Sequence, residues 1–532
     1  MAQPRHEERA SGGGARGRRD VLAGERSSEV DLPPAYEELR RRLGEVYDLW
    51  TAAGLAGWDQ RTQMPPAGAA VRAEQRGTLS RLAHERFVSD EVGLLLEDLA
   101  QLEESLDYDS LEASLIRVTR RDYEKFRRVP SELRAELSRA AALGESVWER
   151  ARAESDFPKF LPCLERNLEL KREYIACFDP ADEDYDHLLD DYERGMKTAE
   201  VRTLFESLKQ GLVPLIEQVA AVDGVDDSCL RATWPLDGQK RFERKVLDAF
   251  GFDEASWRLD ETAHPFASNM AIADIRLTTR HHEDNLTSLF AVMHEFGHGL
   301  YERQVDPALE RSPLARGASL GVHESQSRLW ENQVGRSMPF WRHFYPDLQD
   351  TFHEQLGGVS LDTFYRAVNK VQPSLIRIYA DEATYNLHII LRFELEQDLL
   401  SGALAAAEVP DAWNAKMQEY LGIEPEDVAD GAMQDTHWAS GLIGYFATYT
   451  LGNMISAQLW EKVLEDVPDL HEQMEQGEFT GLREWLREQL HRHGRKFPPG
   501  ETLERAVGAP IDPAPYLRYL RGKVSEIYGI AA

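Results

Sequence analysis

The stretch Met293-His294-Glu295-Phe296-Gly297-His298 decides the predicted fold, because it combines a metal-binding pattern with a helical one. Residues four apart lie on the same face of a helix, so His294 and His298 can direct ring nitrogens at one metal ion. Glu295 lies beside them, with its carboxylate near the open coordination position of that metal. Apolar residues within 287–292 give the helix a side to bury. This H-E-x-x-H arrangement is typical of zinc metallopeptidases.

A hydrolytic zinc site needs a third protein ligand and an open position for water. Tyr301 and Gln304 stand where H-E-x-x-H-x-x-G-x-x-H proteins have Gly and His, which excludes that subclass. The other common solution is a glutamate on a later helix, and Glu324 is the first candidate. By spacing alone, three other glutamates compete with it: Glu302, Glu310 and Glu331.

The segments around the motif favour a mainly α-helical fold of antiparallel helices. Apolar residues recur at helical spacing through residues 35–220, with Arg and Glu on the opposite face. Further segments of the same kind follow the motif. We predict helices over 319–338, 375–400 and 445–463, with a glycine-rich turn region at 431–444.

Residues 266–279 have a different pattern, in which apolar and polar residues alternate. This predicts a strand or hairpin just before the zinc helix. An edge strand beside the metal could bind an extended peptide through backbone hydrogen bonds. A strand that only supports the helix fits the pattern equally well.

The domain organisation is simple. Residues 1–32 are rich in Arg, Gly and Ser, which predicts a disordered tail. Pro33-Pro34 ends that tail and amphipathic helices follow. No internal repeat and no linker appears after Pro34, so residues 33–532 are predicted to form one domain.

Composition excludes several classes of protein. The net charge of −32 argues against nucleic acid or an anionic membrane as a partner, because phosphate binding needs clustered Lys and Arg. No apolar run of about 18 residues and no apolar signal core is present, so we expect no membrane span and a cytoplasmic location. Three cysteines, none in a C-x-x-C pair, predict neither a disulfide framework nor a sulfur-ligated metal site.

Two further motifs match only in part. Asp182, Asp184, Asp186 and Glu193 have the spacing of a calcium-binding loop, but His187 stands where the turn requires glycine. The run from residue 317 to 321 spells G-x-S-x-G, yet no alternating strands and helices surround it as a nucleophile elbow requires. A helix start capped by Ser319 is the better interpretation.

Several separated motifs together resemble the carboxypeptidase Taq family of metallocarboxypeptidases. The resemblance runs from about Tyr36 to the C-terminus. The matching stretches are Trp58-Asp59-Gln60, Met64-Pro65-Pro66, 185–196, His264-Pro265-Phe266, Asp274-Ile275-Arg276-Leu277-Thr278, the zinc motif, His323-Glu324-Ser325-Gln326, Ile376-Arg377-Ile378-Tyr379-Ala380-Asp381, and Gly431-Ala432-Met433-Gln434-Asp435-Thr436-His437-Trp438. Ala447 and Arg194 depart from the pattern, since proline is expected at both.

The resemblance implies a large helical, cleft-containing fold similar to neurolysin and angiotensin-converting enzyme, usually as a homodimer. It implies release of single residues from peptide C-termini with broad preference. The implied cofactor is one divalent metal per subunit, zinc or sometimes cobalt. Carried over residue by residue, the ligands are His294, His298 and Glu324, and the general base is Glu295.

Other roles follow from the chemistry that such an enzyme requires. The oxyanion needs hydrogen-bond donors besides the metal, and we expect His437 with Tyr445 or Tyr449 to supply them. Spacing does not choose between the tyrosines. The alternative for all three is a structural histidine and two core tyrosines.

A carboxypeptidase also needs a cation for the free C-terminal carboxylate. We expect Arg377 to grip it, and a salt bridge between Arg377 and Asp381 is the structural alternative. Arg276 is a second substrate-binding candidate that could instead pair with Asp274. His264 is expected to brace the site rather than to touch the metal.

Two other functions compete with the zinc carboxypeptidase. An oligopeptidase on the same helical scaffold would need no carboxylate clamp and would cut inside peptides. A catalytically silent scaffold would be expected to lack Glu295 or a ligand, and all four residues are present.

Overall fold

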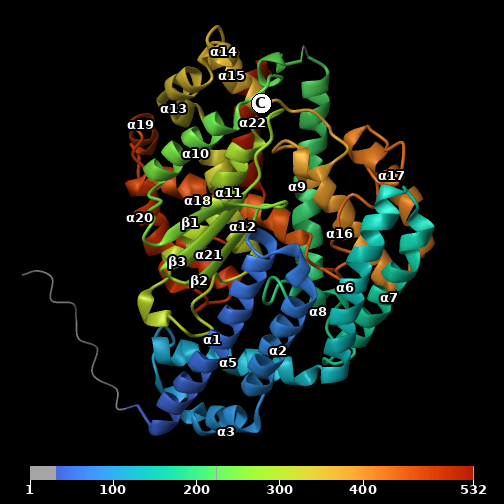
Figure 1. Cartoon of the computed structure of the whole chain (residues 1–532), viewed down its shortest axis with the longest axis vertical. Helices are drawn as coiled ribbons and strands as arrows, with labels where there is room; N and C mark the ends of the chain where they lie inside the picture. Colours follow the sequence, from blue (N-terminus) through green and yellow to red (C-terminus); the bar gives the residue numbers. More distant parts are fainter. Residues whose placement is uncertain (1–31, 223, 531–532) are drawn as a thin grey trace, which may run out of the picture.

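The computed structural model describes residues 32–222 and 224–530, so the predicted tail lies, except for Leu32, outside the described residues. The described chain is mainly helical, with a small β-sheet (Figure 1). This confirms the predicted fold class. Within these ranges no helix is both long enough and apolar enough to cross a membrane.

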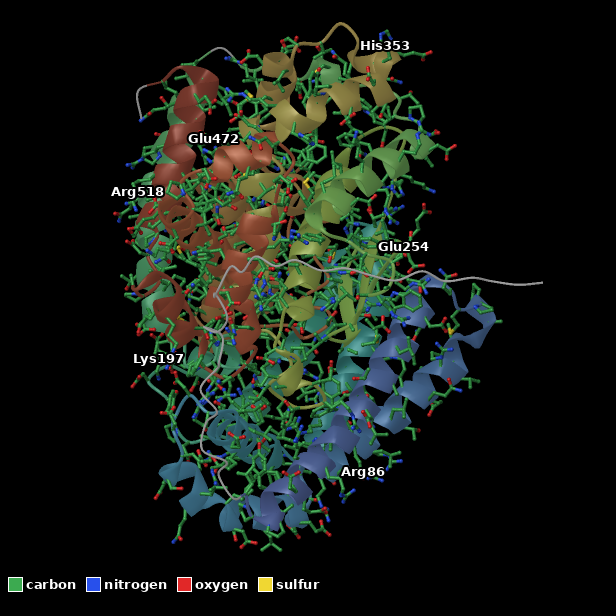
Figure 2. The ribbon with its side chains drawn as sticks, turned by 90° about the vertical axis from the view of Figure 1, so that its left-hand side faces the viewer. Arg86, Lys197, Glu254, His353, Glu472 and Arg518 are labelled. Atoms are coloured by element: carbon green, nitrogen blue, oxygen red, sulfur yellow. The ribbon has the colours of Figure 1, made fainter. Side chains whose placement is uncertain are left out.

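The N-terminal helices build most of a separate apolar core, which Ile272 and residues of the segment 305–315 complete. α1 buries Tyr36, Leu39 and Leu43 at helical spacing, and α2 packs along it to form the long hairpin drawn in blue in Figures 1 and 2. Most side chains of α2 are exposed, among them Arg86 (Figure 2). The helices of this part are α1 (Pro34–Thr62), α2 (Ala69–Phe87), α3 (Asp90–Asp98), α4 (Ala100–Ser105) and α5 (Leu111–Arg128).

The rest of the chain forms two larger apolar cores that meet at α18 (Ala447–Asp466). Leu451 and Met454 of α18 belong to one core, while Ile455 and Leu459 belong to the other. The first core is built on α6 (Ser131–Ala153), α7 (Phe157–Ile175), α8 (Tyr185–Leu189), α9 (Thr198–Ala220), α16 (Tyr385–Ser401), α17 (Val409–Leu421) and α22 (Ala514–Tyr528). The second is built on α10 (Leu236–Phe250), α11 (Thr287–Arg303), α12 (Leu320–Arg328), α13 (Met338–Thr351), α14 (His353–Leu356), α15 (Leu361–Val368), α19 (Leu470–Glu475), α20 (Thr480–Gln489) and α21 (Pro499–Val507).

The sheet consists of β1 (Trp257–Glu261), β2 (Ala267–Ala271) and β3 (Asp274–Thr279), in the order β1-β3-β2. β2 and β3 are antiparallel, which confirms the hairpin predicted before the zinc helix. β1 pairs in parallel with β3 and was not predicted, because it is short and carries charged residues such as Arg258 and Asp260. Only its long-range pairing makes it a strand.

Two glycines let α11 approach its neighbours closely. A Cβ on Gly299 would lie 2.6–2.9 Å from side-chain atoms of Trp257, Ile275 and Leu277 in the sheet. On the opposite side, a Cβ on Gly297 would lie 2.3 Å from the backbone oxygen of Gln326 in α12. α11 is therefore packed between the sheet and α12 at a separation that only glycine permits.

Gly297→Ala is expected to lower the free energy of unfolding by about 1–3 kcal/mol, because backbone atoms must move to admit the methyl group. Urea unfolding of the metal-free protein measures this without a contribution from metal affinity. Gly54→Ala is the control: nothing lies within 4 Å of its added Cβ in α1, so the same change should be neutral or slightly stabilising. Equal stabilities of the two variants would contradict the close packing.

Two predicted helices differ from the structure. The helix expected over 375–400 begins only at Tyr385, because the Asp381 carboxylate accepts hydrogen bonds from the Ala383 and Thr384 backbone amides and so starts α16 there. Before it lies a single turn, Arg377–Tyr379. The helix expected over 319–338 is α12 followed by a wider π-helical segment, Leu329–Val334. Ser319 caps α12 as predicted, accepting from the Val322 amide at 3.1 Å.

Candidate active site

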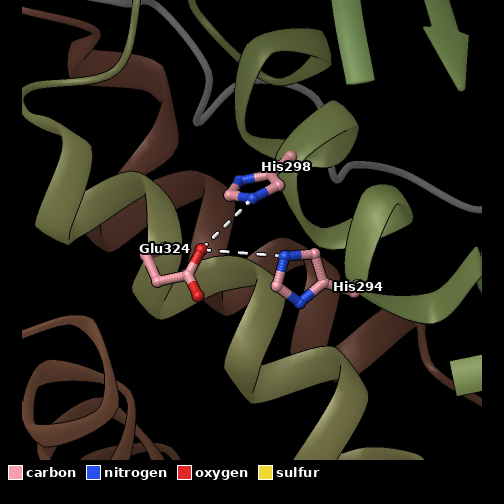
Figure 3. Close-up of side chains that lie close together, drawn as sticks. All are labelled: His294, His298 and Glu324. Carbon is pink, nitrogen blue, oxygen red and sulfur yellow. Dashed lines mark ion pairs between the residues drawn. The ribbon is translucent and has the colours of Figure 1, made fainter. Parts of the chain in front are cut away.

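Two neighbouring helices bring the three predicted metal ligands together. α11 carries His294 and His298, and α12 carries Glu324 (Figure 3). Glu324 Oε2 lies 3.7 Å from His294 Nε2 and 3.4 Å from His298 Nε2. Tetrahedral zinc with bonds of about 2 Å separates its ligands by roughly 3.3 Å, so the three atoms fit such an ion. Burial lowers the pKa of His298 to about 4, which keeps its ring neutral and available as a ligand.

Glu331 contacts a predicted ligand and lies outside the group of three side chains that could hold a metal ion. Its Oε2 lies 2.9 Å from His294 Nδ1, so that Nε2 faces the metal position. Arg328 donates to Glu324 Oε1 at 2.7 Å and also contacts Glu331. Although burial opposes ionisation, Arg328 and the two histidines hold the pKa of Glu324 well below its usual range. Glu324 is therefore anionic, with Oε2 directed at the metal position.

His298 is oriented by a second histidine. His298 Nδ1 lies 2.7 Å from His323 Nδ1, and His323 Nε2 lies 2.8 Å from Glu302 Oε1. When His298 binds metal through Nε2, its Nδ1–H donates to His323, whose Nε2–H then donates to Glu302. Glu302 thus lies at the end of a hydrogen-bonded chain, or relay, and outside the group of three predicted ligands. Glu310, the third competing glutamate, accepts from the Ile272 backbone amide.

His323→Ala is expected to weaken metal binding about 10- to 100-fold, because His298 loses the acceptor that fixes its orientation. Glu302→Gln should weaken it in the same direction. Competition with a chelator of known affinity measures the effect. Glu310→Gln is the matched control, since that carboxylate takes no part in the relay, and an equal loss there would argue against the relay.

Glu295 lies beside the ligands with its carboxylate free. Glu295 is only 7% exposed. Its carboxylate accepts no hydrogen bond from any residue within 32–222 and 224–530. Burial raises the pKa of Glu295 to about 7. A carboxyl group with these properties can both take and return a proton near neutral pH.

Comparisons with known proteins agree with this geometry. The family model described as carboxypeptidase Taq (M32) metallopeptidase matches residues 38–524. The chain belongs to this family. It is therefore an M32 metallocarboxypeptidase, as the motifs predicted.

The M32 relatives are similar along nearly their whole length. "Thermostable carboxypeptidase 1" of Thermus thermophilus is 42% identical over 506 residues, covering 93% of this chain and 99% of the relative. "Carboxypeptidase 1" of Bacillus subtilis is 38% identical, covering 90% and 95%. The crystal structure of the M32 carboxypeptidase from Deinococcus radiodurans R1 superposes with a TM-score of 0.91 at 40% identity, covering 94% of this chain and 100% of that one.

Arg377 of this M32 enzyme lies in a buried charged cluster. Its Nη2 donates to Asp435 Oδ1 at 2.7 Å and its Nη1 donates to the Tyr385 hydroxyl at 2.8 Å. Arg392, which is fully buried, pairs with the same carboxylate. Asp381 forms no pair with Arg377, so that structural alternative is wrong: the Asp381 carboxylate accepts from the Ala383 and Thr384 amides in the turn before α16. Two guanidinium groups thus share one carboxylate, which leaves a positive charge in the cluster.

A chain of contacts joins this cluster to the metal ligands. Arg328, bonded to Glu324, lies over the ring of Tyr385 at 4.3 Å. The Tyr385 hydroxyl in turn accepts from Arg377. Sequence reasoning missed both Arg328 and Tyr385. Arg328 had a signal, since it lies four residues after Glu324 on a helix; Tyr385 had none.

The three oxyanion candidates lie together near the same cluster. His437 Nε2 and the Tyr449 hydroxyl are 3.1 Å apart, and the Tyr445 ring is 5.3 Å from the Tyr449 ring. Burial lowers the pKa of His437 to about 4, so its ring is neutral. Arg377 Cζ lies 4.9 Å from the centre of the Tyr449 ring. The geometry gathers both tyrosines and does not choose between them.

Neither Arg276 nor His264 contacts a predicted metal ligand. Arg276 pairs with Asp274 at 2.8 and 2.9 Å, and its guanidinium lies over the ring of Trp58 at 4.7 Å. This is the structural role considered from the sequence. The His264 side chain is exposed, and within the described ranges it shares no hydrogen bond or ion pair with a metal ligand.

Proposed function

We propose that this enzyme releases single residues from the C-termini of peptides with broad preference, using zinc held by His294, His298 and Glu324. The observation that carries the proposal is the convergence of these ligands beside an unbonded, buried Glu295. Two imidazoles and one carboxylate are the donors of many catalytic zinc sites, and they leave a position open. Cobalt suits the same donors.

Each group in the site has a separate role in the proposed hydrolysis of the peptide bond. A zinc ion bound at this site would supply an acidified water and polarise the scissile carbonyl. Glu295 takes the proton of the attacking water and returns it to the departing amine. Neutral His437, with Tyr445 or Tyr449, donates hydrogen bonds to the carbonyl oxygen as negative charge develops there.

Arg377 is proposed to bind the free C-terminal carboxylate. The cluster of Arg377, Arg392 and Asp435 has one positive charge more than it has negative charges, and an incoming carboxylate would neutralise it. Arg377 is 6% exposed while Arg392 is fully buried, so Arg377 is the residue that can reach substrate. Arg276 and His264 would act at most as supporting residues.

We also propose an assembly state and a location. A homodimer and a cytoplasmic location follow from the family resemblance and from the composition. The free state of Cys163, Cys177 and Cys229 fits a reducing compartment.

The test compares a peptide carrying a free C-terminus with its C-terminally amidated twin. Mass spectrometry after incubation with zinc-loaded enzyme should show a ladder of single C-terminal losses from the free acid only. The Glu295→Gln variant should give no ladder. Internal cleavage of both peptides would indicate an oligopeptidase, and no cleavage by metal-loaded wild type would indicate a silent scaffold.

A further inference from the structure

A large cleft lies next to the metal centre. It has a volume of ≈ 1170 Å³ and lies between α2, α5, α6 and the segment 313–320. Two of its lining residues contact the site: His323 is bonded to the ligand His298, and the ring of Tyr192 lies edge-on at 5.2 Å from that of Tyr445. The lining includes none of the three predicted ligands, so the cleft adjoins the metal centre through His323 and Tyr192.

The cleft is positively charged in a strongly acidic protein. The chain as a whole carries a net charge of −32, yet Arg and Lys outnumber Asp and Glu among the residues that line this cleft. A cleft of one charge sign concentrates ligands of the opposite sign. The lining therefore favours anionic groups, whereas most of the surface repels them.

Most of these cations already have partners. Arg121 donates to Asp190 at 2.7 Å, and Arg495 donates to Asp122 at 2.9 Å. Arg316 has no ion pair, but its guanidinium lies over the ring of Trp50 at 5.6 Å. Arg194 lies in the turn after α8 and is half-buried, and its side chain forms no hydrogen bond, ion pair or cation–π contact with any residue that the structure describes. It is a cation at the cleft wall with no carboxylate of the described residues close enough to form an ion pair.

The surroundings of Arg194 increase its need for an anion. Burial lowers the pKa of Arg194, and the neighbouring guanidinium groups of Arg121 and Arg495 lower it further, while Asp122 and Asp190 offset part of this effect. Burial and the like charges both make the charged form less stable than it would be in water. A carboxylate placed in the cleft would replace the lost hydration and offset the repulsion.

We propose that Arg194 forms a subsite for an acidic side chain of the peptide, on the part of the substrate that the enzyme retains. The proposal rests on the proposed function. The leaving residue is a single amino acid, and its carboxylate is assigned to Arg377. The cleft is larger than the roughly 300–1,000 Å³ of a small-ligand pocket, so it can accommodate several residues of the retained part of the peptide. Peptides with Asp or Glu upstream of the scissile bond are then the preferred substrates.

Calorimetric titration of the zinc-loaded Glu295→Gln protein tests the subsite without turnover. The probes are peptides of equal length with the same C-terminal residue, carrying Glu or Gln at one upstream position at a time. At one position the Glu peptide should bind about ten-fold more tightly, the size expected of a hydrogen-bonded charge pair. Adding Arg194→Gln should reduce the Glu-to-Gln ratio to about one, and raised salt should reduce it in part.

Arg81→Gln is the matched control. It removes the same charge from the cleft, but Arg81 is already paired with Glu85 at 2.9 Å. The Glu-to-Gln ratio should therefore persist in this variant. An equal fall in both variants would show a general effect of cleft charge and would overturn the assignment to Arg194.

The remaining outcomes separate this proposal from the proposed function. Equal binding of Glu and Gln peptides at every position overturns the subsite, while C-terminal release from all of them by the active enzyme leaves the carboxypeptidase function intact. A ratio near ten with no C-terminal release would support the subsite and overturn the function. If Arg194→Gln removes only the discrimination between free acid and amide, the residue holds the terminal carboxylate and the subsite is overturned.

Discussion

Glu295→Gln is expected to reduce kcat by about 10²- to 10⁴-fold, the usual contribution of a positioned general base. Gln has nearly the shape of Glu but cannot take the proton of the attacking water. Because Glu295 accepts no hydrogen bond from the described residues, the exchange breaks no structural contact. Steady-state kinetics on one free-acid peptide measures the loss.

The metal content of the variant separates this explanation from a damaged site. His294, His298 and Glu324 keep their own hydrogen-bond partners, so metal analysis should give the same stoichiometry as in wild type. A fully loaded variant that retains a tenth or more of the wild-type kcat would show that another group accepts the proton.

Arg377→Gln is expected to lower kcat/KM for free-acid peptides by about 10²- to 10³-fold, because the substrate carboxylate loses its partner in a buried setting. Amidated peptides lack that carboxylate and should lose little. The ratio of the two kcat/KM values is therefore the decisive quantity. Asp435 keeps Arg392 as a partner in this variant, which limits damage to the fold.

Arg392→Gln provides the comparison. It removes a guanidinium from the same Asp435 carboxylate, but Arg392 is fully buried and cannot touch the peptide. This variant should be less stable than wild type and still prefer free acids. If both variants lost the preference equally, the charge of the cluster rather than contact with Arg377 would explain it.

Local patterns predicted the parts of the site that lie on one element. His294 and His298 are four residues apart on α11, so a helix alone brings them together. The hairpin of β2 and β3 and the cap at Ser319 also follow from neighbouring residues. The third ligand was different: spacing left four glutamates open, and the family resemblance selected Glu324.

Contacts between distant elements explain what the sequence did not predict. The structural alternative for Arg377, a salt bridge to Asp381, assumed that both lie on one α-helix. That segment forms only a single 3₁₀ turn at Arg377–Tyr379, and Asp435 approaches from another part of the chain. Glu331 reaches His294 from the π-helical segment. Glu302 acts on His298 only through His323, which lies between them. No periodicity in the sequence encodes such distances.

The packing of α11 against α12 through Gly297 has a consequence for how the metal is acquired. The ligands come from two helices whose separation is set by backbone contact, and each ligand is held by a protein partner. In small zinc domains the metal itself drives folding. Here contacts within the protein hold the predicted ligands in place, so little conformational entropy should be lost when an ion binds. Loading and exchange of the metal are then reversible events within a folded enzyme, governed by which ion the surroundings supply.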